Sequence, residues 1–263
     1  MEETIHKNQL SDNCADHLLC LALDVGEGML RNGGEISRVE DTIERICYAY
    51  GAAHVEVFTI ISVIHAAIRL KDGSYSSQMR RVKSTGMNLG KLEQLNDLSR
   101  RICRETPDYI EINAEIKRIK KSSTYPFWAD LLAPSLAVGG FTVFFGGGIF
   151  DTLIAVAIGL MIWFIDSMPS PRLNAMAKTV ISSFIASFIA TAALKLGANV
   201  SSDYIIIGVI MLLVPGVSFG TALKDLLCGD ILAGTMRTMQ ACLGSLMIAF
   251  GYMLAITVLG GAV

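Results

Sequence analysis

Charged residues are scarce in the second half of this chain of 263 residues. Residues 127–263 hold only 5 of the 22 lysines and arginines and 6 of the 24 aspartates and glutamates. A helix needs about 20 apolar residues to cross the core of a bilayer, and the second half offers several such runs in succession. The mean hydropathy of +0.50 is typical of a polytopic membrane protein. The break near Tyr125 therefore predicts a soluble half followed by a membrane half.

Signals for several other functions are also missing. The net charge of −2 provides no basic excess for nucleic acid. The six cysteines form no CxxC pair, and no HExxH motif or Cys/His cluster indicates a metal or another cofactor. Residues 1–7 lack the basic-then-apolar pattern of a secretory signal. The first half is therefore expected to stay in the cytoplasm, with its thiols reduced.

Apolar periodicity predicts that residues 1–125 form a compact α+β domain. Two amphipathic helices separated by Asn32-Gly33-Gly34 should form an antiparallel hairpin. From His54 the period changes to two, which indicates a small antiparallel sheet. The expected elements are a helix ending near Arg31, a helix at 35–50, strands from His54, at 63–70 and at 75–83, and helices at 89–102 and 109–119.

The membrane half, residues 126–263, is predicted to be an α-helical transmembrane domain of five spans. The expected spans are 127–145, 149–166, 177–196, 204–222 and 239–260. Basic residues gather in every second connecting segment, from Lys117–Lys121 before the first span to Arg237 before the last. By the positive-inside rule, the amino-terminal domain should be cytoplasmic and the carboxyl terminus outside.

Pro215-Gly216 interrupts the apolar run at 205–214, so the fourth span should kink or unwind there. In many transporters, unwound backbone at membrane depth forms part of the substrate site. The alternative is a kink that serves helix packing alone. The predicted pathway residues are Pro134, Ser135, Pro215, Gly216, Ser218, Lys178 and Arg237. The last two are expected to attract an anionic solute to the cytoplasmic mouth, and a topology signal alone is the alternative.

Two other groups of residues were weighed for chemistry. Asp130, Asp151 and Asp166 lie at expected span ends, where the simplest interpretation is a solvated carboxylate. The string from Gly216 to Gly220 matches GxSxG, but it lies in an apolar run and all four histidines precede it. No catalytic residue is therefore predicted.

Several segments together resemble the threonine/serine exporter (ThrE) family. Residues 26–43, with the sequence GEGMLRNGGEISRVEDTI, resemble its opening helix-turn-helix. Leu213-Val214-Pro215-Gly216, followed by Asp225-Leu226-Leu227 and Gly229-Asp230, resembles its fourth-span signature. The order of one soluble domain and five spans extends the resemblance over essentially the whole chain.

Full-length members of that family carry ten spans, so this chain looks like the two-gene form, with a YjjP-like large subunit and a short YjjB-like membrane partner. The resemblance implies a secondary exporter of the bacterial inner membrane, not an enzyme, acting on threonine, serine or C4 dicarboxylates such as succinate. Coupling to protons is expected by analogy with secondary transporters. A homo-oligomer is a further possibility. The alternatives are a membrane-anchored sensor or scaffold whose cytoplasmic domain binds a metabolite or partner, and a membrane hydrolase using Ser218.

Overall fold

The computed structural model describes residues 2–83, 85–122, 125–168, 174–196 and 199–259, with side chains from Ala15 onward. The chain divides into two compact units. The first comprises residues 1–124 and 217–238, and the second comprises residues 125–216 and 239–263. Each unit is described by itself.

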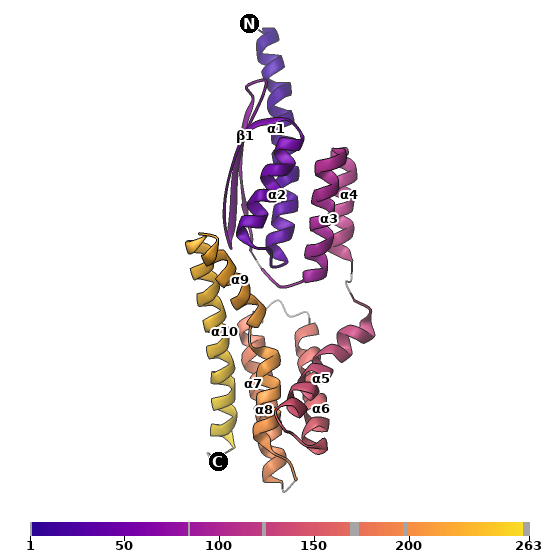
Figure 1. The fold of residues 1–263 in the computed structure, drawn as a ribbon, viewed down its shortest axis with the longest axis vertical. Helices are drawn as coiled ribbons and strands as arrows, with labels where there is room; N and C mark the ends of the chain where they lie inside the picture. Colours follow the sequence, from indigo (N-terminus) through magenta and orange to yellow (C-terminus); the bar gives the residue numbers. More distant parts are fainter. Residues whose placement is uncertain (1, 84, 123–124, 169–173, 197–198, 260–263) are drawn as a thin grey trace. The chain divides into compact units, whose positions relative to one another are not determined.

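The first unit has three layers, with a sheet on one side, α1 and α2 in the middle, and α3 and α4 outside (Figure 1). Helices α1 and α2 pack on the sheet and also contact α3. The apolar faces of these amphipathic helices are thereby buried between the layers. The elements are α1 (Glu2–Arg31), α2 (Ile36–Ala49), β1 (Ala52–Ile60), β2 (Val63–Leu70), β3 (Tyr75–Arg81), α3 (Leu89–Glu105) and α4 (Tyr109–Lys121).

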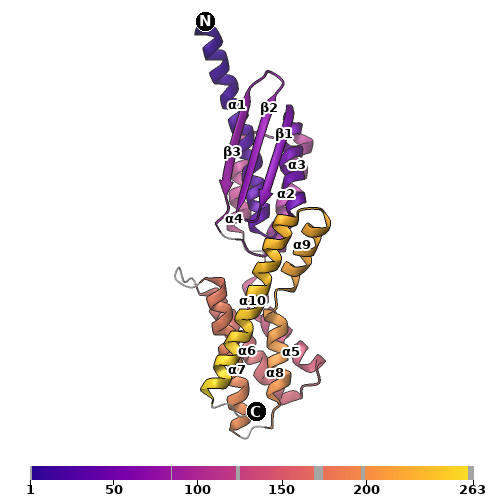
Figure 2. The same cartoon turned by 90° about the vertical axis from the view of Figure 1, so that its left-hand side faces the viewer.

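The sheet is antiparallel throughout, in the order β1-β2-β3 (Figure 2). Val57 pairs with Ala66, and Ala66 pairs with Gln78. The helix-facing side buries Ile64 and Ile68, whereas Phe58 is 58% exposed on the opposite side. Alternation along the strands thus places one face of the sheet in the core.

The core of the first unit draws side chains from all of these layers. It includes Leu19 and Met29 from α1, Ile43 from α2 and Ile102 from α3, each with no exposed surface. It also includes Ala233, which comes from the last helix of the chain. A short part of the apolar half therefore folds with the soluble half.

The second unit is built from helices alone. Its helices are α5 (Phe127–Phe144), α6 (Ile149–Ser167), α7 (Ala175–Lys195), α8 (Ser202–Leu213) and the later part of α10 (Ile231–Val258). Helix α9 (Gly216–Leu227) follows α8 and belongs almost entirely to the first unit. Within the described residues, α5, α6, α7 and α10 are each long and apolar enough to cross a membrane. The bent pair α8 and α9 raises the number of candidate spans from four to five if it counts as one span.

Small residues set the helix contacts of the second unit. A Cβ built on Gly159 of α6 would lie 2.5 Å from Ser135 Cα of α5, so these two backbones almost touch. The face of α7 that is buried carries Ser183, Ser187 and Thr191 at four-residue steps. Helices in lipid associate through such close packing, because water provides no driving force between them.

The element order predicted for the soluble half is confirmed, including a strand at Val63–Leu70. The break in the fourth span is also confirmed, because α8 ends at Leu213 and α9 starts at Gly216. The helix that carries the span expected at 239–260 begins at Ile231. The solvated interpretation of Asp151 is wrong: it is 6% exposed, and its carboxylate accepts hydrogen bonds from the Gly148 and Ser201 N–H groups.

Candidate functional site

The turn between α1 and α2 leaves two backbone groups without partners in their own helices. Gly33 adopts a φ of +91°, and the Gly34 N–H returns to the Met29 carbonyl at 2.9 Å. This glycine-based ending closes α1. The Gly34 carbonyl and the Ile36 N–H at the start of α2 remain available to other parts of the chain.

Asp225 of α9 provides a hydrogen-bond acceptor for the backbone at the start of α2. Its Oδ1 accepts a hydrogen bond from the Ile36 N–H at 3.2 Å. The residue before α2, Glu35, makes no side-chain cap of its own. A carboxylate at a helix amino terminus is stabilised by the orphan N–H groups and by the helix dipole. Asp225 therefore caps α2 from a position 189 residues away in the sequence.

Arg237 of α10 completes this buried cluster. Its Nε lies 3.3 Å from Asp225 Oδ2, and its Nη2 donates to the Gly34 carbonyl at 3.2 Å. The side chain of Asp225 is 0% exposed and that of Arg237 is 10% exposed. Two charges this far from water persist only when they neutralise each other. We call Gly34, Ile36, Asp225 and Arg237 the buried cluster.

A second ion pair lies at the edge of the buried cluster. Lys224 Nζ is 2.9 Å from Glu35 Oε1, and the lysine side chain is 65% exposed. Exposed pairs of this kind contribute little to stability. The buried pair is consequently the main electrostatic link between α2 and the α9–α10 segment.

The turn between α9 and α10 sets the spacing of Asp225 and Arg237. Gly229 has a φ of +96°, and the Asp230 N–H donates to the Asp225 carbonyl at 2.9 Å. A Cβ on Gly234 would lie 2.6 Å from Leu226 Cγ, so α10 can pass this close to α9 only with a glycine there. These glycines bring two helices together so that their charged residues meet.

Glu40 lies near the same turn. Its Oε1 accepts the Thr59 N–H at 2.6 Å. Burial raises the pKa of Glu40, the Thr59 hydrogen bond lowers it, and the negative charge of Asp230 raises it further.

The predicted break residues Pro215, Gly216 and Ser218 lie at the junction of α8 and α9. The two helices are bent by 44° at this break. The Gly216 N–H donates to the Val214 carbonyl at 2.8 Å, which is a tight turn in place of a helical bond. A Cβ on Gly216 would meet nothing within 4 Å among the described residues, so their packing does not require a glycine there. Ser218 is half-buried.

Pro134 and Ser135 lie inside α5, at its close crossing with α6. Ser135 is 1% exposed, and its hydroxyl has no hydrogen-bond partner within the described residues. Proline at position 134 also removes one backbone donor from this helix. The site therefore combines a tight backbone contact with unsatisfied polar groups.

The two predicted solute-attracting cations have different surroundings. Lys178 donates to the Asp166 carbonyl at 2.7 Å and to the Met168 carbonyl at 3.1 Å, at the carboxyl end of α6. Arg237 belongs to the buried cluster. Their role as attractors of a solute stays a prediction.

Sequence reasoning missed the pairing of Arg237 with Asp225 and its contact with the α1–α2 turn. Asp225 is named there only as part of the family signature Asp225-Leu226-Leu227. The available signal was that Asp225 and Arg237 are charged residues within or beside long apolar runs, where ionisable groups usually pair. Nothing in the sequence identified the turn at Gly34 as the third participant.

Comparison with known proteins gives one family. The family profile named ThrE, described as "Putative threonine/serine exporter", matches residues 20–259. A protein of Klebsiella aerogenes named "Probable succinate transporter subunit YjjP" is 25% identical over 88% of this chain and 90% of its own length. The protein of the same name in Escherichia coli K12 is 24% identical over 91% of this chain and 94% of its own length.

Another relative is much longer than this chain. The "Pheromone-regulated membrane protein 10" of Debaryomyces hansenii is 26% identical over 66% of this chain, but the match spans only 18% of that protein. No solved structure matches the chain.

Proposed function

Because the chain belongs to the threonine/serine exporter family, we propose that it moves small polar metabolites out of the bacterial cytoplasm. The match over residues 20–259 carries this proposal, since it includes both the soluble elements and the candidate spans. The chain is a subunit of a membrane exporter and not an enzyme. The proposed substrates are threonine, serine or C4 dicarboxylates such as succinate.

The proposed transport step uses the break between α8 and α9. Val214 and Pro215 lie between α8 and α9, outside both helices. Unwound backbone at membrane depth can bind a polar solute. Transport then requires that the solute bind inward- and outward-facing states differently. Pro215, Gly216 and Ser218, together with Pro134 and Ser135, are the proposed pathway residues.

A partner subunit is part of the proposal. The two relatives of nearly equal length are both named as subunits of a succinate transporter. We expect a short YjjB-like membrane protein to complete the pathway, or a second copy of this chain. Helices of this second protein would line the part of the substrate pathway that the helices of this chain do not.

The proposed location is the bacterial inner membrane, with residues 1–124 in the cytoplasm and the carboxyl terminus outside. Support comes from Arg118, Lys120 and Lys121 in the last turn of α4, just before the first candidate span. Basic residues beside a span are retained on the cytoplasmic side.

Export of labelled threonine, serine and succinate tests the function. Cells lacking their own exporters are loaded and compared with and without this chain, and with and without a co-expressed YjjB-like membrane protein. Faster efflux of at least one of the three solutes is expected. Equal efflux of all three in every strain would contradict the substrate proposal.

Two variants locate the transport step. Pro215→Leu should abolish efflux because it allows α8 to continue, whereas Ser218→Ala should retain efflux because its hydroxyl is one of several polar groups near the break. Loss of efflux only in Ser218→Ala, with normal membrane levels of both proteins, would contradict a role for the break.

A further inference from the structure

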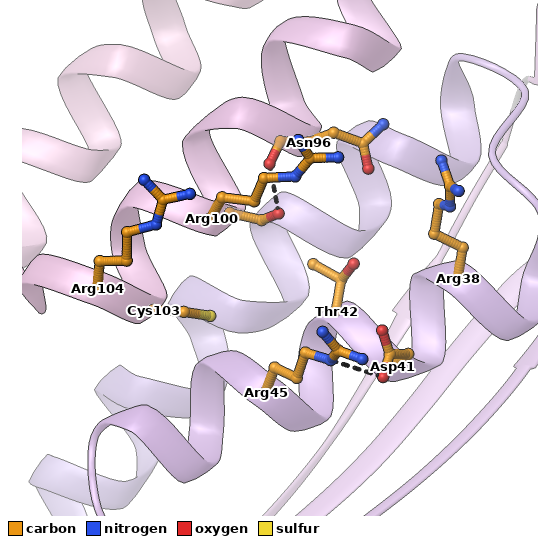
Figure 3. Close-up of a pocket in the computed structure, with 9 residues that line it drawn as sticks. Arg38, Asp41, Thr42, Arg45, Asn96, Arg100, Cys103 and Arg104 are labelled. Atoms are coloured by element: carbon orange, nitrogen blue, oxygen red, sulfur yellow. Dashed lines mark hydrogen bonds and ion pairs between the residues drawn. The ribbon is translucent and has the colours of Figure 1, made fainter.

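An open groove between α2 and α3 collects arginine side chains (Figure 3). Its volume is about 360 Å³. Arg38 and Arg45 reach it from α2, and Arg100 and Arg104 reach it from α3. Steps of seven and of four residues place each pair on one face of its helix. We call these four residues the arginine groove.

The charge of the arginine groove is only partly compensated. Asp41 is its one lining carboxylate and lies 2.8 Å from Arg45 Nε. Arg100 has a weak contact of 4.0 Å with Asp97, outside this lining. Within the described residues, neither Arg38 nor Arg104 has an ion-pair partner. The lining therefore holds four guanidinium groups and one carboxylate, and Glu93 and Asp97 lie in an adjoining pocket that Arg38 and Arg100 also line.

The floor of the groove is polar and buried. Thr42 is 7% exposed and Ser99 is 8% exposed. The Ser99 hydroxyl donates to the Asn96 carbonyl at 2.7 Å, while the Thr42 hydroxyl makes no hydrogen bond within the described residues. A ligand in the groove would thus meet hydroxyl groups below and guanidinium groups on both sides.

We propose that the arginine groove is a binding site for a small soluble dianion that carries carboxylate or phosphate groups. The planar guanidinium matches both groups with paired, charge-assisted hydrogen bonds. Arginines on two opposing helices suit a ligand with negative charge at two ends. The volume is at the lower end of the range for small-molecule sites, about 300–1,000 Å³.

The groove lies entirely in the first unit and outside the proposed pathway residues. Occupancy of the arginine groove would depend on the concentration of the anion around the first unit. The site differs from the transport step, and the inference holds whichever metabolite is exported.

Calorimetry on the full chain tests the site. The chain is placed in nanodiscs of phosphatidylcholine and titrated with succinate, inorganic phosphate and pyrophosphate, and with succinamide as the uncharged match of succinate. At least one dianion should bind and succinamide should not. Binding should weaken with added salt, because salt screens charges at an open site.

The double variant Arg38→Gln/Arg104→Gln should weaken this binding by about tenfold or more, since it removes the two unpaired guanidinium groups. Arg69→Gln/Arg81→Gln is the matched control, because it removes two exposed arginines from the sheet. Pro215→Leu separates the groove from the pathway, and should leave dianion binding unchanged while export is lost.

Three outcomes would overturn the proposal. The first is no binding of any dianion. The second is equal weakening in the groove variant and its sheet control. The third is binding only of anionic lipid, seen as stabilisation by phosphatidylglycerol discs that requires Arg38 and Arg104 while no free dianion binds.

Discussion

At the scale of single residues, the buried ion pair of Asp225 and Arg237 should be the most sensitive to substitution. Asp225 holds the start of α2 and the guanidinium of Arg237 with one carboxylate. Both side chains are removed from water, so each depends on the other for neutralisation. The net value of such a pair can be small, but the loss of one partner is costly.

Asp225→Ala should therefore destabilise the first unit by about 3–5 kcal/mol, because it leaves Arg237 buried without a counter-charge. Lys224→Gln is the matched control on the same helix, and its exposed pair should cost no more than about 1 kcal/mol. Thermal unfolding of the full chain in detergent measures both. Equal midpoints for the two variants would contradict the central role of the buried cluster.

Glu40 provides a prediction about pH. Burial raises the pKa of this carboxyl group, so the folded chain binds its proton more tightly than the unfolded chain. The stability from this proton is present at low pH and is lost as pH rises through the folded pKa. Glu40→Gln keeps an oxygen that can accept the Thr59 N–H and removes the charge.

Glu40→Gln should raise the unfolding midpoint at pH 7, and its advantage over the natural chain should shrink as the pH falls toward 4. Midpoints of both chains measured across this range test the sign. Glu93→Gln removes a glutamate charge at an exposed position of α3 and serves as the control. An advantage that grows on acidification would show that burial does not dominate at Glu40.

At the scale of elements, glycines decide where helices cross. Gly159 and Gly140 are both helical, yet a Cβ on Gly159 would overlap the Ser135 backbone and a Cβ on Gly140 would meet nothing within 4 Å. The sequence shows a helical glycine at both positions and does not tell which one lies at a helix crossing. Only the neighbouring helix makes one of them necessary.

Gly159→Ala should destabilise the bundle by about 1–3 kcal/mol, because overpacking separates α5 from α6. Gly140→Ala should be neutral or stabilising by up to about 1 kcal/mol, since alanine favours a helix. Unfolding midpoints in detergent and efflux from cells measure the two effects. A larger loss in Gly140→Ala would mean that Gly140 contacts a surface outside this chain.

At the scale of the whole molecule, the first unit constrains topology. The α9–α10 turn and the elements of residues 1–124 form one compact unit with a shared core that includes Ala233. A single packed unit must lie on one side of a membrane. This argument is independent of the basic residues that orient the spans.

Cys228, exposed in the α9–α10 turn, should therefore react from the same side as Met79→Cys on the sheet. Asn199→Cys, between α7 and α8, should react from the opposite side. Each cysteine is placed alone in a chain lacking other thiols, and intact cells are treated with an impermeant maleimide before and after lysis. Labelling of Cys228 and Met79→Cys from opposite sides would contradict the shared unit.

Much of the fold could be predicted from local patterns. Alternating and helical periodicities located the elements of the soluble half, because each depends on residues a few positions apart. Pro215 likewise predicted the break in the fourth span, since proline removes a backbone donor wherever it stands. The span expected at 239–260 lies in a helix that begins at Ile231, and Arg237, expected between two spans, is buried within α10.

The sequence alone predicted a soluble half and a membrane half, because composition reflects the solvent of each segment. It also determined the family through motifs of nearby residues. The tertiary structure decided that Asp225 caps α2, that Arg237 binds the Gly34 carbonyl, and that arginines of α2 and α3 share one groove. These depend on contacts between residues far apart in the chain, and local periodicity contains no information about which distant helix faces meet.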